Sequence, residues 1–443
     1  MRPLRHGVAT SAYQIEGAVD TDGRGPSVWD VFCAQPGRVL DGSDGRTACD
    51  SYHRQAEDLA LLEQLGVSSY RFSIAWPRVQ PSGSGAVNTA GLDHYERLVD
   101  ALLARGLQPL PTLYHWDLPQ PLEDAGGWPT RETALRFADY AGLVADRLAD
   151  RVTDWATHNE PWCTAFLGYA SGVFAPGRRE DDAAFASAHH LLLSHALAGE
   201  QLHARSADAR VGIVLNLAPV HAEDGGDPRA VDVVDAVQNR LWLQALSQGS
   251  YPEVLPQLAG HDDDLALVRG SADWVGVNYY TPFRIAAPDG HAADAVGQDV
   301  DAFPSAPPFA FAPRPPLTAM GWEIDASGLE QVLLRVAEQL PGVPLRVTEN
   351  GASFPDDDRD DSGSVVDSDR IAYLRDHLAA VVRARDAGAA VTDYIAWSLL
   401  DNFEWAQGYT QTFGLVTVEP ATLRRVPKAS FRWYAQHVRA AGG

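Results

Sequence analysis

Two glutamates end short apolar runs in different parts of the sequence. Glu160 ends the stretch TDWATHNE and precedes a proline, and Glu349 lies in LRVTENG, just before Asn350. Paired carboxyl groups suit glycoside hydrolysis, because one must be protonated to serve the leaving oxygen while the other, ionised, attacks or assists at the anomeric carbon. The first question is therefore whether the fold brings Glu160 and Glu349 together.

Polar and aromatic side chains accompany the glutamates at the ends of the other apolar runs. Each of them alone is better explained as a strand cap, but charged groups are excluded from cores unless they are paired or used. The chain also has 12 tryptophans, whose faces can stack on sugar rings while amides, imidazoles and carboxylates bond to hydroxyl groups. The set comprises Gln14, Glu16, Arg71, His115, Trp116, Asp117, Asn159, Asn216, Asn278, Tyr279, Tyr280, Asn350, Trp397, Asp401, Asn402, Glu404 and Trp405.

Other site chemistries find less support. The histidines at positions 6, 53, 115, 158 and 195 show no zinc-ligand spacing, and His189 and His190 adjoin in a helical pattern. No Gly-x-Ser-x-Gly elbow, dinucleotide fingerprint or phosphate loop is present, so esterase, dehydrogenase and kinase hypotheses lack support. The acidic stretch 355–369 faintly resembles a calcium loop, but Asp361 occupies the place of the turn glycine, and we interpret it as a solvated surface loop. No metal or cofactor is expected.

The composition is that of a globular protein with a strong negative charge. The 443 residues are 45% hydrophobic and 21% charged, and the formal net charge is −24. This charge argues against nucleic acid or an anionic membrane as a partner and suits a neutral or cationic small molecule. The cysteines Cys33, Cys49 and Cys163 have no framework spacing and are expected to be reduced thiols. The N-terminal residues contain no apolar signal-peptide region, so a cytoplasmic location is predicted.

Eight short apolar runs alternate with amphipathic helical patterns along the chain. One helical pattern passes through Tyr95, Leu98 and Leu102, and another covers 374–382. Eight alternations predict a single closed (β/α)₈ TIM barrel with elaborated βα loops over residues 1–443, with an open doubly wound sheet as the main alternative. The expected strands are 7–12, 68–76, 107–114, 152–159, 210–217, 274–280, 344–349 and 391–398.

In such a barrel the carboxyl ends of the strands meet at one face, where the polar set would converge. Side chains alternate along a regular strand, so Asn159 and Glu160 cannot both face the axis if pairing continues through them. We therefore predict that regular pairing ends or bulges at Asn159–Glu160, with Pro161 helping to close the ladder. The segment 285–321 follows the sixth strand and would overhang the same face as part of a lid.

Seven ordered segments of the chain resemble glycoside hydrolase family 1, the retaining β-glucosidases and β-galactosidases built on a (β/α)₈ barrel. They are ATSAYQIEGA (9–18), YRFSIAWPR (70–78), YHWDLPQPL (114–122), HNEPWC (158–163), VNYYTP (277–282), VTENG (347–351) and SLLDNFEWAQGY (398–409). The resemblance covers almost the full length, from Ala9 to Tyr434. It implies a β-glucosidase-type hydrolase that also accepts β-galactosides or β-fucosides.

The same resemblance implies roles for individual residues. Glu160 would be the general acid/base and Glu349 the nucleophile, with Arg71 supporting Glu349. The implied substrate-binding residues are Gln14, His115, Trp116, Asn159, Asn278, Tyr280, Trp322, Trp397, Glu404 and Trp405, among which Trp397 is a stacking platform and Trp322 lies in the aglycone channel. Family members that act on 6-phosphorylated sugars have a small residue in place of Glu404 and a nearby lysine, so this chain is expected to take unphosphorylated β-glycosides or short oligosaccharides.

Physical arguments assign the two glutamates the same roles. A guanidinium at Arg71 and a phenol donor at Tyr280 would favour the ionised form of Glu349. Burial among Trp155, Trp162 and Phe166 would raise the pKa of Glu160 and keep it protonated. A separation of about 5 Å between the carboxyl groups is predicted for double displacement with retention.

Two residue types near Glu160 are interpreted as packing. His158, which replaces the apolar or aromatic residue usual in the family before Asn-Glu-Pro, is expected to fill the core with one hydrogen bond, in preference to tuning Glu160. Cys49 and Cys163 are likewise interpreted as packing residues.

The alternative functions are a sugar-binding pseudoenzyme, which the presence of both carboxylates disfavours, and a transglycosylase, which the sequence does not distinguish from a hydrolase. Association of the chain with copies of itself, as a homo-oligomer, is left open.

Overall fold

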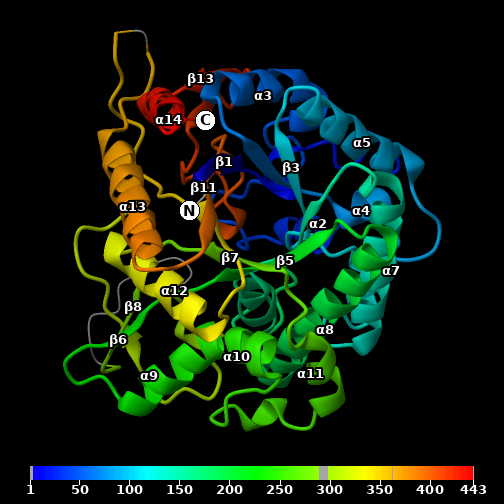
Figure 1. Ribbon diagram of the computed structural model, residues 1–443, viewed down its shortest axis with the longest axis vertical. Coiled ribbons are helices and arrows are strands. Elements are labelled where there is room, and N and C mark those ends of the chain that lie inside the picture. The colour runs from blue at the N-terminus through cyan, green and yellow to red at the C-terminus, as the bar shows by residue number, and fades with distance from the viewer. Residues whose placement is uncertain (1–2, 289–297, 362, 443) are drawn as a thin grey trace.

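The computed structural model describes residues 3–288, 298–361 and 363–442. The barrel strands are β1 (Arg5–Ala9), β2 (Ser69–Ser73), β3 (Gln108–Tyr114), β4 (Asp154–Asn159), β5 (Arg210–Asn216), β7 (Trp274–Asn278), β10 (Leu345–Asn350) and β11 (Val391–Trp397). All eight are parallel, and β1 pairs with both β11 and β2, which closes the ring (Figure 1). The predicted TIM barrel is confirmed, and the open sheet is wrong because the ring has no free edge.

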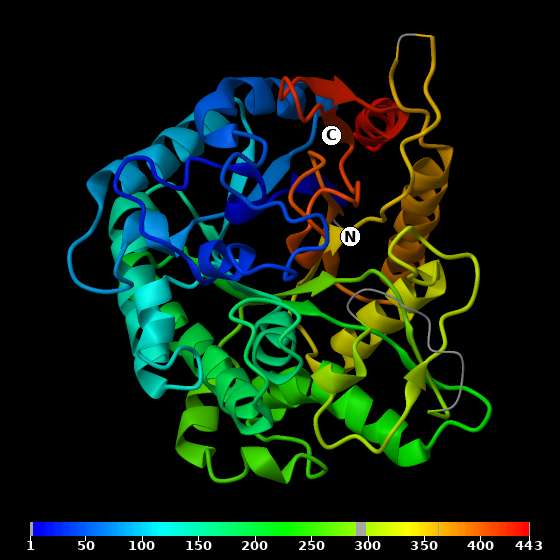
Figure 2. The same cartoon turned by 180° about the vertical axis from the view of Figure 1, so that it is seen from behind.

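Helices surround the barrel in both views of the molecule (Figures 1 and 2). The helix α5 buries Tyr95 and Leu102, as its pattern predicts. On α13, however, Val382 is 49% exposed, so the buried apolar face of that helix is narrower than predicted. The main outer helices are α3 (Ser51–Leu65), α5 (Thr89–Leu103), α7 (Arg131–Leu148), α8 (Asp181–Arg205), α10 (Leu241–Gln248), α12 (Ala326–Gln339), α13 (Ser368–Asp386) and α14 (Ala429–Ala440).

Shorter elements fill the loops between the strands and the outer helices. The short α-helices are α1 (Ala12–Ile15), α2 (Val28–Cys33), α4 (Trp76–Val79), α6 (Gln120–Asp124), α9 (Pro228–Asp235) and α11 (Asp262–Val268). The π-helices are η1 (Cys163–Ala170) and η2 (Ala236–Arg240), and the 3₁₀ turns are η3 (Pro256–Leu258), η4 (Val300–Ala302) and η5 (Trp405–Gln407). Two small sheets join β6 (Val220–Ala222), β8 (Phe283–Ala286) and β9 (Ala310–Phe311), and β12 (Val416–Val418) with β13 (Arg425–Pro427).

The strands are apolar on both faces because each face packs against a different core. On β5, Ile213 and Leu215 belong to the large cluster shared with the helices, whereas Val214 belongs to a small cluster inside the barrel. The inner space is tight: a Cβ atom on Gly212 would lie 2.3 Å from the ring of Trp274. The continuous apolar runs that predicted the strands are therefore the signature of a sheet buried on both sides.

Buried ion pairs fill the amino-terminal end of the barrel. Arg346, at the start of β10, bonds to Asp154 Oδ1 at 2.5 Å and lies 3.6 Å from Asp393 Oδ2, and its guanidinium stacks over Trp274. All three charged side chains are almost fully buried. Charges that are this well paired hold the strand ends in register and leave chemistry to the opposite, carboxyl end.

The acidic stretch 355–369 is only partly the solvated loop that the sequence predicts. Its middle is exposed, but Asp356 pairs with buried Lys428 at 2.7 Å, and Asp367 is buried against Arg370 and Ser430. The loop therefore fastens α13 and α14 together. Within the predicted lid 285–321, residues 289–297 lie outside the described part of the chain.

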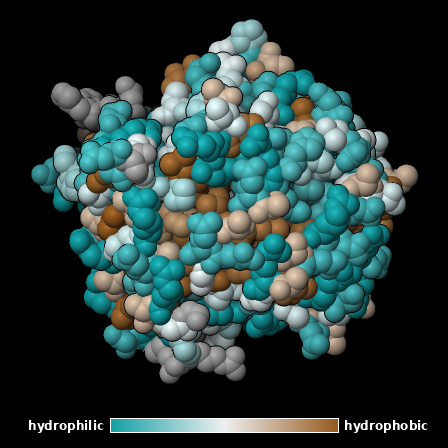
Figure 3. Space-filling view, turned by 90° about the horizontal axis from the view of Figure 1, so that it is seen from above, coloured by the Kyte–Doolittle hydropathy of each residue, from teal (hydrophilic) through white to brown (hydrophobic). Residues whose placement is uncertain are grey.

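The face of the molecule shown in Figure 3 is largely hydrophilic, with hydrophobic residues in small groups between the hydrophilic ones. This agrees with the formal net charge of −24. None of the described helices combines the length and the apolar character that crossing a membrane requires.

Candidate active site

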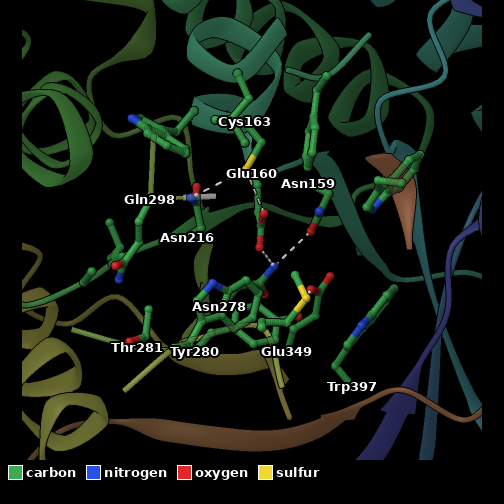
Figure 4. Close-up of a pocket in the computed structure, with 18 of the residues that line it drawn as sticks. Asn159, Glu160, Cys163, Asn216, Asn278, Tyr280, Thr281, Gln298, Glu349 and Trp397 are labelled. Carbon is green, nitrogen blue, oxygen red and sulfur yellow. Dashed lines mark hydrogen bonds between the residues drawn. The ribbon is translucent and has the colours of Figure 1, made fainter. Parts of the chain in front are cut away.

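A cavity of about 910 Å³, its open mouth included, lies at the carboxyl ends of the barrel strands. Both glutamates line it, Glu160 after β4 and Glu349 in β10, so the fold brings together the pair that the sequence singles out (Figure 4). Of the predicted binding residues, those that also line the cavity are His115, Trp116, Asn159, Asn278, Tyr280, Trp322, Trp397, Glu404 and Trp405.

An irregularity in β4 turns both Asn159 and Glu160 toward the cavity. Thr157 and His158 both face outward and bond to α8, through His195 and Ser194 respectively, and the pairing with β5 shifts register between Ala156 and Asn159. The strand ends at Asn159, and Glu160 has a left-handed φ of +45°. The predicted end of regular pairing is confirmed, but the bulge lies before Asn159 because two successive side chains face outward there.

Glu160 is a buried carboxyl group whose side-chain hydrogen-bond partners are both neutral. Asn278 Nδ2 donates to its Oε1 atom at 2.7 Å, and the thiol of Cys163 donates to its Oε2 atom at 3.1 Å. Burial, reinforced by the negative charge of Glu349, raises the pKa of Glu160 to about 8. The group therefore holds a proton at neutral pH.

Glu349 is equally buried but is bonded differently. Arg71 Nη1 donates to its Oε1 atom at 2.5 Å, and the hydroxyl of Tyr280 donates to its Oε2 atom at 2.6 Å. Burial raises the pKa of Glu349, and both donors oppose that shift. Because one of its two donors is the cationic guanidinium of Arg71, Glu349 is the carboxylate of the pair. Arg71 and Tyr280 lie against Glu349, where the sequence predicts them.

A network of fixed donors orients the residues between the two glutamates. Arg71 Nη2 donates to Asn159 Oδ1, so the amide nitrogen of Asn159 is free to donate to His115 Nε2 at 3.1 Å. Burial and the charge of Arg71 hold the pKa of His115 well below its ordinary value. The imidazole is therefore neutral and carries its proton on Nδ1.

Aromatic rings form one wall of the cavity. Trp397, at the end of β11, and Trp405 are both stacked with His115, at centroid distances of 6.0 and 5.9 Å, and Trp116 packs against Trp405 at 4.6 Å. Glu404 lines the cavity beside this wall, and burial together with the two other carboxyls raises its pKa to about 8. A flat apolar wall beside hydrogen-bonding groups is the chemistry of a sugar subsite.

Amide side chains line the other side of the cavity. Figure 4 shows the two glutamates between Trp397 on one side and Gln298 and Thr281 on the other. Within the described residues, Gln298 is 7% exposed with neither end of its amide bonded, and Asn216 Oδ1 also has no partner. Buried amide groups without partners are costly, so these atoms are available for a ligand.

Some of the predicted polar residues do not line the cavity. Gln14 donates to Asn402 and to the carbonyl of Phe403, and it accepts from Ser11, which places it behind the loop that carries Glu404. The remaining residues bond to the surrounding elements. They are Glu16, held by Arg78 and Tyr95; Tyr279, whose hydroxyl donates to the carbonyl of Asp325; Asn350, which donates to Tyr373 and to the carbonyl of Tyr279; and Asp401, paired with Lys428. Asp117 is the exception, because its buried carboxyl oxygens have no hydrogen-bond partner among the described residues.

The packing predictions near Glu160 have mixed outcomes. His158 is fully buried, stacks on Phe137 and makes one hydrogen bond, to Ser194, so the packing interpretation is confirmed. The same interpretation is wrong for Cys163, which lines the cavity and bonds to Glu160. Trp155 faces outward and donates to the carbonyl of Val152, so it does not surround Glu160.

Potential metal ligands gather at one place in the described chain, outside the cavity lining. His189, His261 and Asp264 have ligand atoms within 4.8 Å of one another. The two imidazole rings are stacked at 3.7 Å, so their lone pairs run side by side and do not converge on one point. Asp264 is also paired with Arg131. This arrangement is better suited to fastening α8 to α11 than to holding an ion.

The chain matches the family model described as Glycosyl hydrolase family 1 over residues 4–442. It is 48% identical to a thermostable beta-glucosidase B of Thermobispora bispora over 98% of this chain and 90% of that protein. It is 45% identical to a bifunctional beta-D-glucosidase/beta-D-fucosidase of Bifidobacterium breve, over 98% of this chain and 96% of that one.

The fold is similar to solved structures over the same length. A beta-glucosidase from Thermotoga maritima in complex with azafagomine superposes with a TM-score of 0.92 at 40% identity, covering 100% of this chain and 98% of that one. The same enzyme in complex with deoxynojirimycin gives a TM-score of 0.91 at 39% identity, again over 100% of this chain and 98% of that one. These relatives, found by sequence and by fold, are thus all named beta-glucosidases, one of them also a beta-D-fucosidase.

Proposed function

This chain belongs to glycosyl hydrolase family 1, and from that premise we propose that Glu160 is its acid–base residue and Glu349 its nucleophile. The enzyme is a retaining β-glycosidase of the β-glucosidase type. The observation that carries the assignment is the unequal bonding of the two carboxyl groups. Glu349 accepts from a guanidinium and a phenol, one on each oxygen, whereas Glu160 accepts only from an amide and a thiol.

The first half-reaction depends on this difference in protonation between Glu160 and Glu349. The carboxylate of Glu349 attacks the anomeric carbon while the bond from that carbon to the leaving oxygen breaks, and the proton of Glu160 passes to the leaving oxygen. The product is an ester between the sugar and Glu349. We expect the two carboxyl groups to be about 5 Å apart, the separation that double displacement requires.

The second half-reaction reverses the proton transfer. Glu160, now ionised, takes a proton from a water molecule whose oxygen attacks the anomeric carbon, and Glu349 departs as a carboxylate. Formation of the ester removes the charge that helps to raise the pKa of Glu160. The pKa of Glu160 therefore falls when the group must act as a base and rises again when Glu349 is released.

The cavity suits an unphosphorylated sugar ring. Trp397 and His115 offer flat faces, while Asn159 and Glu404 offer groups for hydroxyls, and the relatives are named for glucosidase and fucosidase activity. A phosphate would meet three carboxyl groups, and the guanidinium of Arg71 is already bonded to Glu349 and Asn159. Lys428 is paired with Asp356 and Asp401 outside the cavity lining.

The leaving-group side suits a second sugar. Asn216 Oδ1 and both ends of the Gln298 amide face the cavity without partners in the described chain, and Trp322 packs beside them on Tyr280. A hydroxylated leaving group would satisfy these amides, whereas an apolar aglycone would leave them unbonded. We therefore expect disaccharides such as cellobiose and short β-linked oligosaccharides to be substrates.

The three free thiols, Cys33, Cys49 and Cys163, support a reducing, cytoplasmic compartment.

Hydrolysis of nitrophenyl β-glucoside and of cellobiose by the wild type and two variants tests the assignment. Glu349→Gly should lose turnover by a factor of at least about 10³ on both substrates, because no nucleophile remains. Glu160→Ala should lose far more glycosylation rate on cellobiose than on the nitrophenyl glucoside, whose leaving group needs little acid help. Wild-type turnover by Glu349→Gly, or equal losses on both substrates in Glu160→Ala, would overturn the roles.

A further inference from the structure

The hydrogen bonds around Glu160 determine which of its oxygens carries the acid proton. Arg71 can only donate, so Asn159 Oδ1, at 2.7 Å from Arg71 Nη2, is an acceptor. The Asn278 amide atom that lies 3.0 Å from this same oxygen must then be the nitrogen, and that nitrogen also lies 2.7 Å from Glu160 Oε1. An amide nitrogen donates and does not accept, so Oε1 is an acceptor. The unprotonated oxygen of a carboxylic acid is the better acceptor, and the amide N–H is a stronger donor than the thiol of Cys163, so the proton of Glu160 is assigned to Oε2, the oxygen that faces the weaker donor.

The side chain bonded to Oε2 is Cys163, whose sulfur lies 3.1 Å away. Cys163 begins η1, and its backbone N–H donates to the carbonyl oxygen of Glu160 at 2.9 Å, which fixes the sulfur beside the carboxyl group. On its other side the sulfur accepts from Asn216 Nδ2 at 3.7 Å, so the S–H remains to point at Glu160 (Figure 4). Burial holds the pKa of the thiol well above its ordinary value, so the thiol remains a donor.

Resting on the role proposed for Glu160, we propose that Cys163 is a positioning residue that aims the acid proton at the leaving oxygen. A protonated carboxyl oxygen has, in the plane of the group, one direction for its proton and one for an acceptor lone pair. The S–H of Cys163 takes the lone-pair direction of Oε2. The proton is therefore turned away from the sulfur and into the cavity, where the leaving oxygen arrives.

A thiol suits this task better than a hydroxyl group. A hydrogen bond donated to the ionised form lowers the pKa of a carboxyl group, and the thiol is a weak donor. Cys163 lowers the pKa of Glu160 against the larger effects of burial and Glu349, which together raise it to about 8. The carboxyl group is thus held in place without being driven into its ionised form.

Several other charged or titratable groups face Glu160 and must be separated from the effect of Cys163. They are Glu349 on β10, Arg71 on β2, Tyr280 after β7 and Glu404 after β11. Glu404 has a raised pKa of about 8 of its own. A substrate whose leaving group needs no acid distinguishes the effects of the two carboxyl groups. With such a substrate, the fall in kcat/KM at alkaline pH (the alkaline limb) disappears if it is due to Glu160 and remains if it is due to Glu404.

The test measures the pH dependence of kcat/KM for cellobiose and for dinitrophenyl β-glucoside in the wild type and in Cys163→Ala, Cys163→Val and Cys163→Ser. The alanine and valine variants lack the donor and should lose about 10-fold on cellobiose but less than about 2-fold on the dinitrophenyl substrate. The alkaline limb of their kcat/KM profile on cellobiose should move to higher pH by about half a unit. The serine variant should regain most of the cellobiose activity and move the limb down by a similar amount, since a hydroxyl is the stronger donor.

Cys33→Ala is the matched control, because Cys33 is also a free thiol but is not part of the cavity lining. It should leave both the limb and the ratio of the two activities unchanged. Equal losses on the two substrates with an unmoved limb, or no recovery in Cys163→Ser, would show a packing role and overturn the proposal. Failure of the proposed function would look different, because the wild type itself would then release no sugar from either substrate.

Discussion

Burial alone does not distinguish an acid from a nucleophile, since Glu160 and Glu349 are both almost completely buried. The difference lies in their donors. Arg71 and Tyr280 stabilise the charge on Glu349, and that charge then helps to keep Glu160 protonated. The two carboxyl groups therefore titrate as a pair, with one proton between them at neutral pH.

Removing the charge of Glu349 should change the acid directly. In Glu349→Gln the repulsion that raises the pKa of Glu160 is absent, so this pKa should fall below about 8 while burial keeps it above the ordinary value of a glutamate. A pH titration of the isotopically labelled Glu160 carboxyl by NMR measures the shift. An unchanged or higher pKa would mean that the two groups do not interact.

At this scale the sequence predicts residue types better than partners. Glu160, Glu349 and Tyr280 were recognisable because each lies at or near the end of an apolar run, and Arg71 because it is a charged residue inside one. Gln298 was not, because it lies in a long irregular segment whose path depends on tertiary contacts. The role of Cys163 was also missed, although its place three residues after Glu160, in the turn that follows a strand, was an available signal.

At the scale of elements, the alternation of apolar runs was sufficient to predict all eight strands. The exception is β4, where regular alternation was assumed up to Asn159. The outward bonds of Thr157 and His158 to α8 produce a bulge there, and no local pattern in the strand reveals the partners on α8. Loops above the barrel were predictable only as loops, because their course depends on contacts distant in sequence.

The two ends of the barrel should respond differently to mutation. Asp154→Ala leaves Arg346 without its closest partner in a buried site at the amino-terminal end, so the free energy of unfolding should fall by about 3 kcal/mol. Because the change is at the end opposite the cavity, kcat on nitrophenyl β-glucoside should stay within about 2-fold of the wild type. Urea unfolding and steady-state kinetics measure the two effects.

Glu419→Ala provides the comparison, since its pair with Arg424 lies at the surface. This variant should leave the free energy of unfolding close to that of the wild type, because an exposed ion pair contributes little to stability. A similar effect of Asp154→Ala would mean that the buried ion pairs do not stabilise the barrel.

At the scale of the whole molecule, acidic residues outnumber basic ones, and three carboxyl groups line the cavity. The formal net charge is −24, and Glu160, Glu349 and Glu404 all line the same cavity. The arrangement therefore favours neutral sugars over anionic ones.

A 6-phosphorylated substrate should expose this preference. The kcat/KM for nitrophenyl β-glucoside 6-phosphate should be at least about 100-fold below that for the unphosphorylated glucoside. The ratio should widen as pH rises through about 8, because Glu404 loses its proton there and adds a negative charge. Comparable activity on both substrates would contradict the proposed sugar subsite.

The central claim is that Glu349 forms a covalent bond to the sugar during turnover. Incubation with a 2-deoxy-2-fluoro-β-glucoside bearing an activated leaving group should slow the second half-reaction and allow the ester to accumulate. Mass spectrometry of the intact protein and of its proteolytic peptides should then find one added fluoroglucosyl group, on Glu349 in the peptide that contains VTENG. A label on Glu160, or an active enzyme that accumulates no label, would contradict this account.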